Sequence, residues 1–218
     1  MFKNYFKIAF RNLVKHSLFT GLNIFGLATG MACSILIFLW VQDEVSYDKF
    51  NTNADKMYRI TAKLSDIESA VVPPPLAATI KAEIPFIKNA TRLVALHKLI
   101  TAGTKNFDEK NIYYVDTNFL SMFNYPLVKG SAATVLTALD AVVITEATAL
   151  KYFGNTEGAV GKTIYIDDEI KGRNLVVTGV LKNIPSNSHL QFNLLLPIEL
   201  YDKKGNYEWD NYAAYVYF

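Results

Sequence analysis

The most apolar part of the sequence is Leu27-Ala-Thr-Gly-Met-Ala-Cys-Ser-Ile-Leu-Ile-Phe-Leu-Trp-Val41, which lies in a stretch without charged side chains, residues 17–42. A bilayer core about 30 Å thick needs roughly 20 helical residues, so this stretch is long enough to cross a membrane. A cleaved signal peptide would have a shorter apolar region, followed by a cleavage site of small residues. Here the apolar run ends in bulky side chains at residues 38–41. The sequence therefore predicts one uncleaved transmembrane helix over residues 17–42.

The charges on the two sides of this predicted helix differ in sign. All 20 acidic residues of the chain lie at or after Asp43, whereas the residues before the helix include four basic ones: Lys3, Lys7, Arg11 and Lys15. Basic flanks stay on the cytoplasmic side of a membrane. We therefore expect a cytoplasmic N-terminus and an extracytoplasmic domain from residue 43 onward. The net charge of the 218 residues is only +2, which gives no electrostatic signature of nucleic-acid binding.

The four basic residues also recur every four positions within residues 1–16. On a helix they share one slowly drifting face, and apolar side chains fill much of the opposite face: Phe2, Phe6, Ala9, Phe10, Leu13 and Val14. A basic amphipathic helix of this kind lies in the headgroup region against anionic lipid. Residues 1–16 are therefore predicted to form an interfacial helix. The alternative is that the charges only orient the transmembrane helix.

Small residues mark one face of the predicted transmembrane helix. Gly26, Gly30 and Ser34 are four positions apart, and small residues at that spacing allow another helix to approach closely. These three residues are candidates for a helix-packing face. Cys33 is the only cysteine, so we expect neither a disulfide within the chain nor a thiolate metal cluster.

Residues 43–218 have the composition of an extracytoplasmic α+β domain with a mixed sheet and short helices. Alternating or apolar runs predict strands at residues 57–64, 91–99, 112–115, 141–144, 163–166, 175–181, 191–196 and 212–218. Helices are predicted after Pro73-Pro-Pro75 at residues 76–84, after an Asp116 N-cap at 117–123, and between Thr145 and Gly154 at 146–153. The strand at 212–218 is expected to leave an apolar edge unpaired, which predicts a domain that is incomplete at its C-terminus.

None of the residue patterns predicts a catalytic, metal or cofactor site. Gly158-Ala-Val-Gly-Lys-Thr163 has Thr156 where a phosphate loop needs glycine, and it leads into a predicted strand instead of a helix. His16, His97 and His189 are far apart, and Ser186, Ser188 and His189 after Pro185 are expected to form a hydrogen-bonded turn. Asp167-Asp-Glu169 is expected to be a solvated turn.

Several stretches of the sequence together resemble one family. They begin with Asn4-Tyr-Phe-Lys-Ile-Ala-Phe-Arg-Asn-Leu13, Asn23-Ile-Phe-Gly-Leu-Ala-Thr-Gly-Met-Ala32 and Asp43-Glu-Val-Ser-Tyr-Asp-Lys-Phe50. They continue with Val115-Asp-Thr-Asn-Phe119, Lys151-Tyr-Phe-Gly154 and Ile184-Pro-Ser-Asn-Ser-His189. Over essentially its whole length the chain is similar to the start of MacB/FtsX-type ABC transporter permeases, in which a first membrane helix is followed by a MacB-like periplasmic core domain.

The resemblance implies an inner-membrane permease component that couples a separate cytoplasmic ABC ATPase to movements outside the cell, and not an enzyme. The implied partners are the membrane, that ATPase subunit, the remaining permease helices or a second permease copy, and a periplasmic adaptor protein. No cofactor is implied. Nothing after Gln42 is apolar enough to span a bilayer, so we expect the chain to be the N-terminal part of a permease. The alternatives are a free-standing membrane-anchored binding module and an anchored ectoenzyme.

Overall fold

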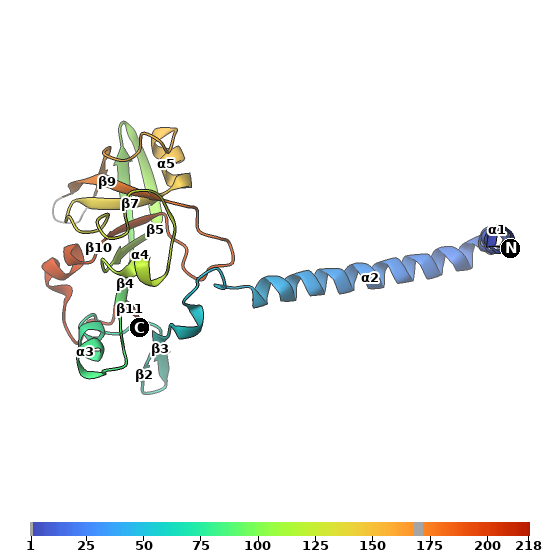
Figure 1. Cartoon of the computed structure of the whole chain (residues 1–218), viewed down its shortest axis with the longest axis horizontal. Coiled ribbons are helices and arrows are strands. Elements are labelled where there is room, and N and C mark those ends of the chain that lie inside the picture. Colours follow the sequence, from blue (N-terminus) through green and yellow to red (C-terminus); the bar gives the residue numbers. More distant parts are fainter. Residues whose placement is uncertain (1, 168–171) are drawn as a thin grey trace. The chain divides into compact units, whose positions relative to one another are not determined.

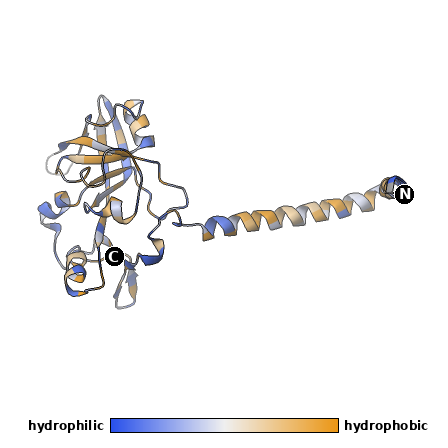
Figure 2. Ribbon diagram, in the orientation of Figure 1, coloured by the Kyte–Doolittle hydropathy of each residue, from blue (hydrophilic) through white to orange (hydrophobic). Residues whose placement is uncertain are grey.

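The structure is a computed structural model that describes residues 2–167 and 172–218. The chain forms two compact units, Met1–Tyr47 and Asp48–Phe218. The first unit consists of helix α1 (Phe2–Lys15) and helix α2 (Ser17–Val45). Among the described residues, α2 is the one helix long and apolar enough to cross a membrane, with a mean hydropathy of 2.2 over 18 residues. Figure 2 shows this hydrophobic character along most of α2.

The second unit, which we call the outer domain, is built around a mixed sheet (Figure 1). The strands of the outer domain are β1 (Arg59–Ile60), β2 (Ala62–Leu64), β3 (Ile67–Ser69), β4 (Thr91–Ala102), β5 (Lys105–Val115), β6 (Leu127–Lys129), β7 (Ala141–Thr145), β8 (Thr163–Ile166), β9 (Arg173–Leu181), β10 (Leu194–Pro197) and β11 (Ala214–Tyr217). Its helical elements are η1 (Ala54–Lys56), α3 (Leu76–Glu83), α4 (Phe119–Met122), α5 (Glu146–Phe153), α6 (Glu199–Tyr201) and η2 (Asp202–Asn206).

Six strands of the outer domain close into a ring. Within the described residues the main sheet has the order β1-β11-β4-β5-β10-β7-β9-β6, and β8 pairs with both β4 and β9. The hydrogen-bonded path from β4 through β5, β10, β7, β9 and β8 therefore returns to β4. The β5–β10 and β7–β9 pairs are parallel and the others are antiparallel, which confirms the mixed sheet. Closure removes the free edges of these six strands.

Both faces of the central strands are buried, because successive side chains on a strand point to opposite sides. Val142 and Ile144 of β7 belong to one apolar cluster, whereas Val143 between them belongs to another. The helices cover the two clusters separately: α3 and α5 contribute to the first and α4 to the second. In Figure 1, α5 lies at one end of the outer domain and α3 at the other.

Helix α5 has the predicted boundaries and caps. The Thr145 hydroxyl accepts a hydrogen bond from the amide of Thr148 at 3.3 Å, which satisfies one of the free N–H groups at the start of the helix. Gly154 ends the helix with a φ of 75°, a left-handed conformation that glycine adopts without strain. Helix α3 also lies where it was predicted, after the three prolines.

Three predictions about the outer domain are wrong. The strand at 57–64 is divided, because β1 joins the main sheet while β2 pairs with β3 in a separate hairpin. Asp116 is not the N-cap of α4, because Asn118 holds that position and the Asp116 carboxylate binds Arg92. The strand at 212–218 is not an unpaired edge, because β11 lies between β1 and β4. By contrast, the predicted strands at 91–99 and 112–115 are confirmed, and they lie within two longer strands, β4 and β5, which form a hairpin joined at residues 103–104.

Candidate functional site

The outer domain begins with residues 48–60, here called the neck segment, which follow α2 in the chain. Backbone hydrogen bonds tie both ends of this segment to the domain. At the first end, the Asp48 amide donates to the Asn187 carbonyl at 2.9 Å. At the other end, Tyr58 and Phe218 exchange two backbone hydrogen bonds, each 3.0 Å long. The neck segment is therefore hydrogen-bonded to the 185–189 loop at one end and to the residue that follows β11 at the other.

The Asp48 carboxylate is the centre of a polar cluster at the start of the neck segment. One of its oxygens accepts hydrogen bonds from the Ser188 hydroxyl and the His189 amide, both at 3.1 Å. The other oxygen lies 2.5 Å from Nδ1 of His189. Nε2 of the same ring lies 2.8 Å from the Tyr217 hydroxyl. We call Asp48, Ser188, His189 and Tyr217 the anchor cluster.

The hydrogen bonds of the anchor cluster indicate a structural role, not a catalytic one. A carboxylate can only accept hydrogen bonds, so Nδ1 of His189 carries a proton and donates it to Asp48. The Ser188 hydroxyl donates to Asp48 and is buried, with 2% of its surface exposed. It is therefore not paired with the imidazole in the way a catalytic serine would be. The predicted hydrogen-bonded turn at residues 185–189 is confirmed, with the added feature that it holds the neck segment.

Aromatic packing also connects the neck segment to the core of the outer domain. Phe50 of the neck segment packs against Tyr125, with ring centroids 5.9 Å apart, and Tyr125 belongs to the core cluster that includes α4. A cavity of about 390 Å³ lies beside these residues and is also lined by Asp48, Arg59 and His189. Burial raises the pKa of Tyr125 to about 12, and burial also raises the pKa of Tyr217. Both phenols are therefore protonated at neutral pH.

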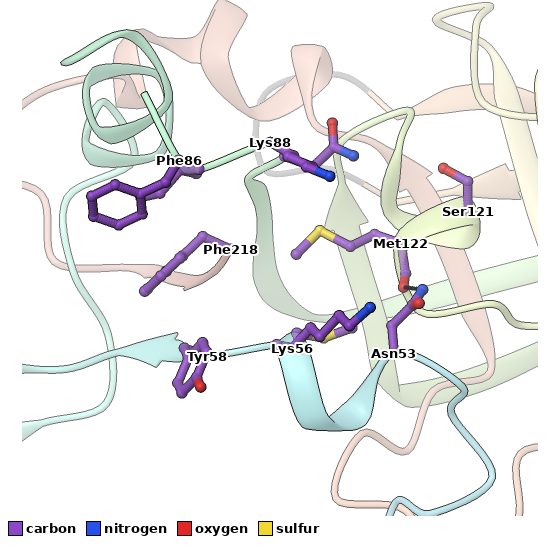
Figure 3. Close-up of a pocket in the computed structure, with 11 residues that line it drawn as sticks. Asn53, Lys56, Tyr58, Phe86, Lys88, Ser121, Met122 and Phe218 are labelled. Atoms are coloured by element: carbon purple, nitrogen blue, oxygen red, sulfur yellow. Dashed lines mark hydrogen bonds between the residues drawn. The ribbon is translucent and has the colours of Figure 1, made fainter. Parts of the chain in front are cut away.

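The other side of the neck segment forms one wall of a larger groove of about 560 Å³. Figure 3 shows Asn53, Lys56 and Tyr58 on this wall and Phe86, Lys88 and Met122 around the rest of the groove. The side-chain Nδ2 of Asn53 donates a 2.9 Å hydrogen bond to the Met122 carbonyl and so fixes the neck segment to α4. The neck segment therefore separates two cavities of the outer domain.

Two further polar clusters stabilise the outer domain away from the neck segment. Glu109, 2% exposed, is held by Lys151 and accepts hydrogen bonds from the Tyr152 hydroxyl and the Asn193 amide, both at 3.0 Å. Burial and the charge of Glu109 raise the pKa of Tyr152 above its usual value. These groups satisfy one another, as buried polar groups must.

The second cluster surrounds Arg92 of β4. Its guanidinium pairs with Asp116 at 2.7 Å and with Asp202 at 3.0 Å, and it lies over the Tyr207 ring at 5.3 Å from the centroid. Burial raises the pKa of Asp202, although the charge of Arg92 opposes that shift. The cluster joins β4 to the residue that follows β5 and to η2, and no local sequence pattern indicates it.

The residues predicted from the sequence to contact membrane or helices lie on the first unit. Lys3, Lys7, Arg11 and Lys15 are all on α1. Gly26, Gly30 and Ser34 line a shallow groove along α2, and the Ser34 hydroxyl donates to the Gly30 carbonyl at 2.9 Å. A Cβ atom added at Gly26 or Gly30 would meet no atom within 4 Å. The role of this face in helix packing stays a prediction.

The Gly-Lys-Thr motif of the sequence lies in a turn. Gly161 has a φ of 85° and leads into strand β8, which confirms that the Gly-Lys-Thr stretch is a turn. Of the acidic stretch at 167–169, Asp168 and Glu169 lie outside the described residues. Among residues 2–167 and 172–218, no group of three or more His, Cys, Asp or Glu side chains is placed to hold a metal ion.

Sequence reasoning did not identify the neck segment as a site. Asp48 and His189 are 141 residues apart and each has an ordinary local context. One signal was present: both residues lie inside stretches that carry the family resemblance, 43–50 and 184–189. Two polar residues embedded in such stretches are candidates for a shared contact.

The sequence profile of the MacB-like periplasmic core domain matches residues 20–217 of the chain. No curated protein sequence matches significantly. A solved domain of a Porphyromonas gingivalis protein described as a permease is similar, with a TM-score of 0.67, 24% identity, and coverage of 77% of this chain and 76% of that one.

Two other solved structures share the fold. The periplasmic region of MacB from Actinobacillus actinomycetemcomitans has a TM-score of 0.54 and 19% identity, with coverage of 74% of this chain and 72% of that one. The extracellular domain of the noncanonic ABC-type transporter YknZ from Gram-positive bacteria has a TM-score of 0.52 and 15% identity, with coverage of 74% and 80%.

Proposed function

This chain belongs to the family of MacB-like periplasmic core domains, and from that premise we propose that it is a permease component in which the neck segment passes movement between the membrane helix and the outer domain. The observation that carries this proposal is the anchor cluster, in which Asp48 makes three contacts with the 188–189 loop. The proposed role is mechanical and involves no catalytic residue of this chain.

A short connection joins the end of α2 to the anchor cluster. Helix α2 continues to Val45, only three positions before Asp48. An α-helix is a rigid element, and the Asp48 carboxylate is bound to a loop between two core strands, β9 and β10. Few residues lie between the end of α2 and this contact. A displacement of the end of α2 would therefore be passed to the loop with little loss. Coupling through packed elements and hydrogen-bond networks requires this kind of continuity.

The membrane arrangement is part of the same proposal. The basic residues of α1 would hold the N-terminus at the cytoplasmic surface of the inner membrane and lie against anionic lipid. The outer domain would then be periplasmic. Gly26, Gly30 and Ser34 would contact either the remaining permease helices or a second permease copy. The driving partner would be a separate cytoplasmic ABC ATPase, and a periplasmic adaptor protein would contact the outer domain.

Hydrogen–deuterium exchange tests the coupling. The full chain is purified in nanodiscs with the ATPase that accompanies it in its native membrane, and exchange is compared with and without a non-hydrolysable ATP analogue. We expect nucleotide to change exchange at residues 48–60 and 185–189, because these segments carry the movement. Asp48→Asn should retain the ATPase but lose the change at 185–189, whereas Asp55→Asn, in the same segment, should behave like wild type. Absence of any nucleotide effect in the wild-type complex would refute coupling.

The second candidate function is a free-standing membrane-anchored binding module. The closed ring of six strands favours it, because a closed sheet is a rigid support for a binding surface, and so does the groove beside the neck segment. A chain that retains a ligand in the groove but never co-purifies with an ATPase would favour this function over coupling.

A further inference from the structure

The groove beside the neck segment has the dimensions of a small-molecule site. Its volume of about 560 Å³ lies within the range of roughly 300–1,000 Å³ typical of ligand pockets. Eleven described residues line it, whereas a stable protein–protein interface uses about 20–30 residues on each side. A ligand of limited size therefore fits this groove better than a folded partner does.

One end of the groove is aromatic and open to solvent. Figure 3 shows Phe86, Phe218 and Tyr58 gathered there. Phe86 is 82% exposed and Tyr58 is 61% exposed, although the Tyr58 ring also stacks on Phe218 with centroids 5.7 Å apart. Exposed aromatic surface is costly in water, and contiguous exposed apolar patches often mark binding sites. This end favours an apolar ligand group.

The groove is also lined by basic side chains. Lys56 and Lys88 line it, and no acidic residue does among the described lining residues. In Figure 3 their side chains lie on opposite sides of Met122. Neither lysine forms a salt bridge within the part of the chain that the structure describes. Two ammonium groups beside an apolar surface are complementary to one negative charge carried on an apolar body.

We propose that this groove binds a single-chain anionic amphiphile, a fatty-acid-like molecule whose carboxylate pairs with Lys56 and Lys88 and whose chain covers the aromatic end. Methionine side chains adapt to irregular apolar shapes, so Met57 and Met122 suit a flexible chain better than a rigid ring system. The assignment concerns binding only and does not depend on the coupling proposed above.

Photolabelling tests this assignment on the full chain in nanodiscs of phosphatidylcholine, which carries no net charge. The probe is a 16-carbon fatty acid with a diazirine near the end of its chain, and the comparison probe is the corresponding alcohol. After illumination, labelled peptides are mapped by mass spectrometry. We expect the acid to label residues 53–58, 86–89 and 121–122, and the alcohol to label them about fivefold less, because two exposed ion pairs contribute on the order of 1 kcal/mol.

Charge variants separate an anion site from a merely apolar groove. Lys56→Gln/Lys88→Gln should reduce labelling by the acid to the level of the alcohol, whereas Lys63→Gln/Lys81→Gln, which removes two exposed lysines outside the groove, should leave it unchanged. Phe86→Ser should reduce labelling by both probes. Equal labelling by acid and alcohol, an unaltered pattern in the Lys56→Gln/Lys88→Gln variant, or competition by phosphatidylglycerol but not by palmitate would each overturn the proposal.

Discussion

Nδ1 of His189 lies 2.5 Å from the Asp48 carboxylate, although 141 residues separate the two in the sequence. The contact joins the first residue of the outer domain to the loop between β9 and β10. Since Asp48 also accepts from the Ser188 hydroxyl and the His189 amide, one carboxylate satisfies three donors. The stability of the neck segment should therefore depend strongly on this side chain.

Replacing Asp48 with asparagine should lower the free energy of unfolding by about 1–3 kcal/mol, because it removes the charge that these donors share and leaves at least one donor poorly paired. The measurement is urea unfolding of the full chain in a non-ionic detergent. Asp55→Asn is the matched control, since Asp55 is an exposed acidic residue of the same segment, and it should change the value by less than about 0.5 kcal/mol. Equal effects of the two variants would remove the special role of Asp48.

The charges around α2 should fix its orientation. A reporter that is active only outside the cytoplasm, fused after residue 60, should be active, because four basic residues precede α2 and the acidic residues begin only at Asp43, in its last turn. Changing Lys3, Lys7, Arg11 and Lys15 together to glutamine should weaken that preference and give a mixed population. Activity of a strictly cytoplasmic reporter at the same position in the wild type would reverse the predicted topology.

The small-residue face of α2 should mediate helix contact in the membrane. Gly26→Leu/Gly30→Leu should weaken association with other permease helices or with a second copy, because leucine prevents close approach. The double substitution makes α2 more hydrophobic, so its insertion into the membrane should be unaffected. Ala28→Leu/Ala32→Leu is the control, since these positions have the same spacing and lie about 200° away around the helix. Association is measured by energy transfer between labelled chains in bilayers. Identical transfer in both double variants would contradict a specific contact.

Alkaline pH should destabilise the outer domain through its buried tyrosines. Burial raises the pKa of Tyr125 to about 12, whereas an unfolded tyrosine has a pKa of about 10. The stabilising effect of the protonated phenol is therefore complete below pH 10 and is lost as the pH rises from about 10 to 12. The free energy of unfolding lost through Tyr125 is about 1 kcal/mol by pH 11.

Urea unfolding between pH 8 and 11 checks this expectation. At each pH, the free energy of unfolding of Tyr125→Phe is subtracted from that of the wild type. This subtraction cancels the effects of lysines and of other tyrosines that titrate in both proteins. The variant should lose less stability than the wild type above pH 10, and the two curves should run parallel below pH 9. Curves that stay parallel throughout would mean that Tyr125 is not buried in the way the structure places it.

Some of the fold followed from local sequence alone. Helix α2 was predictable because residues 17–42 contain no charge, and a long apolar run needs no tertiary contact to indicate a membrane helix. Helix α5 was predictable because its signals are local: Thr145 at its start, Gly154 at its end and apolar residues at helical spacing between them. The apolar runs of β7 and β10 indicated buried strands, since both faces of those strands are covered.

Contacts between distant residues could not be predicted in this way. The pattern of residues 57–64 suggested one strand, but only Arg59–Ile60 pairs with β11, and Ala62–Leu64 forms a separate hairpin with β3. Asp116 had the local features of an N-cap, but its carboxylate binds Arg92. A local N-cap pattern contains no information about a partner 24 residues away. Strand register and ion pairing depend on which segments meet, and sequence periodicity does not specify the partner.

The sequence by itself therefore determined the membrane helix, the α+β character of the outer domain and the residues that carry the family resemblance. The tertiary structure alone decided that β8 closes the ring of strands, that the neck segment lies between two cavities, and that Asp48 binds His189. The physical reason is that helix propensity and hydropathy are properties of neighbouring residues, whereas these three features are stabilised by contacts that form only when segments far apart in the chain fold against one another.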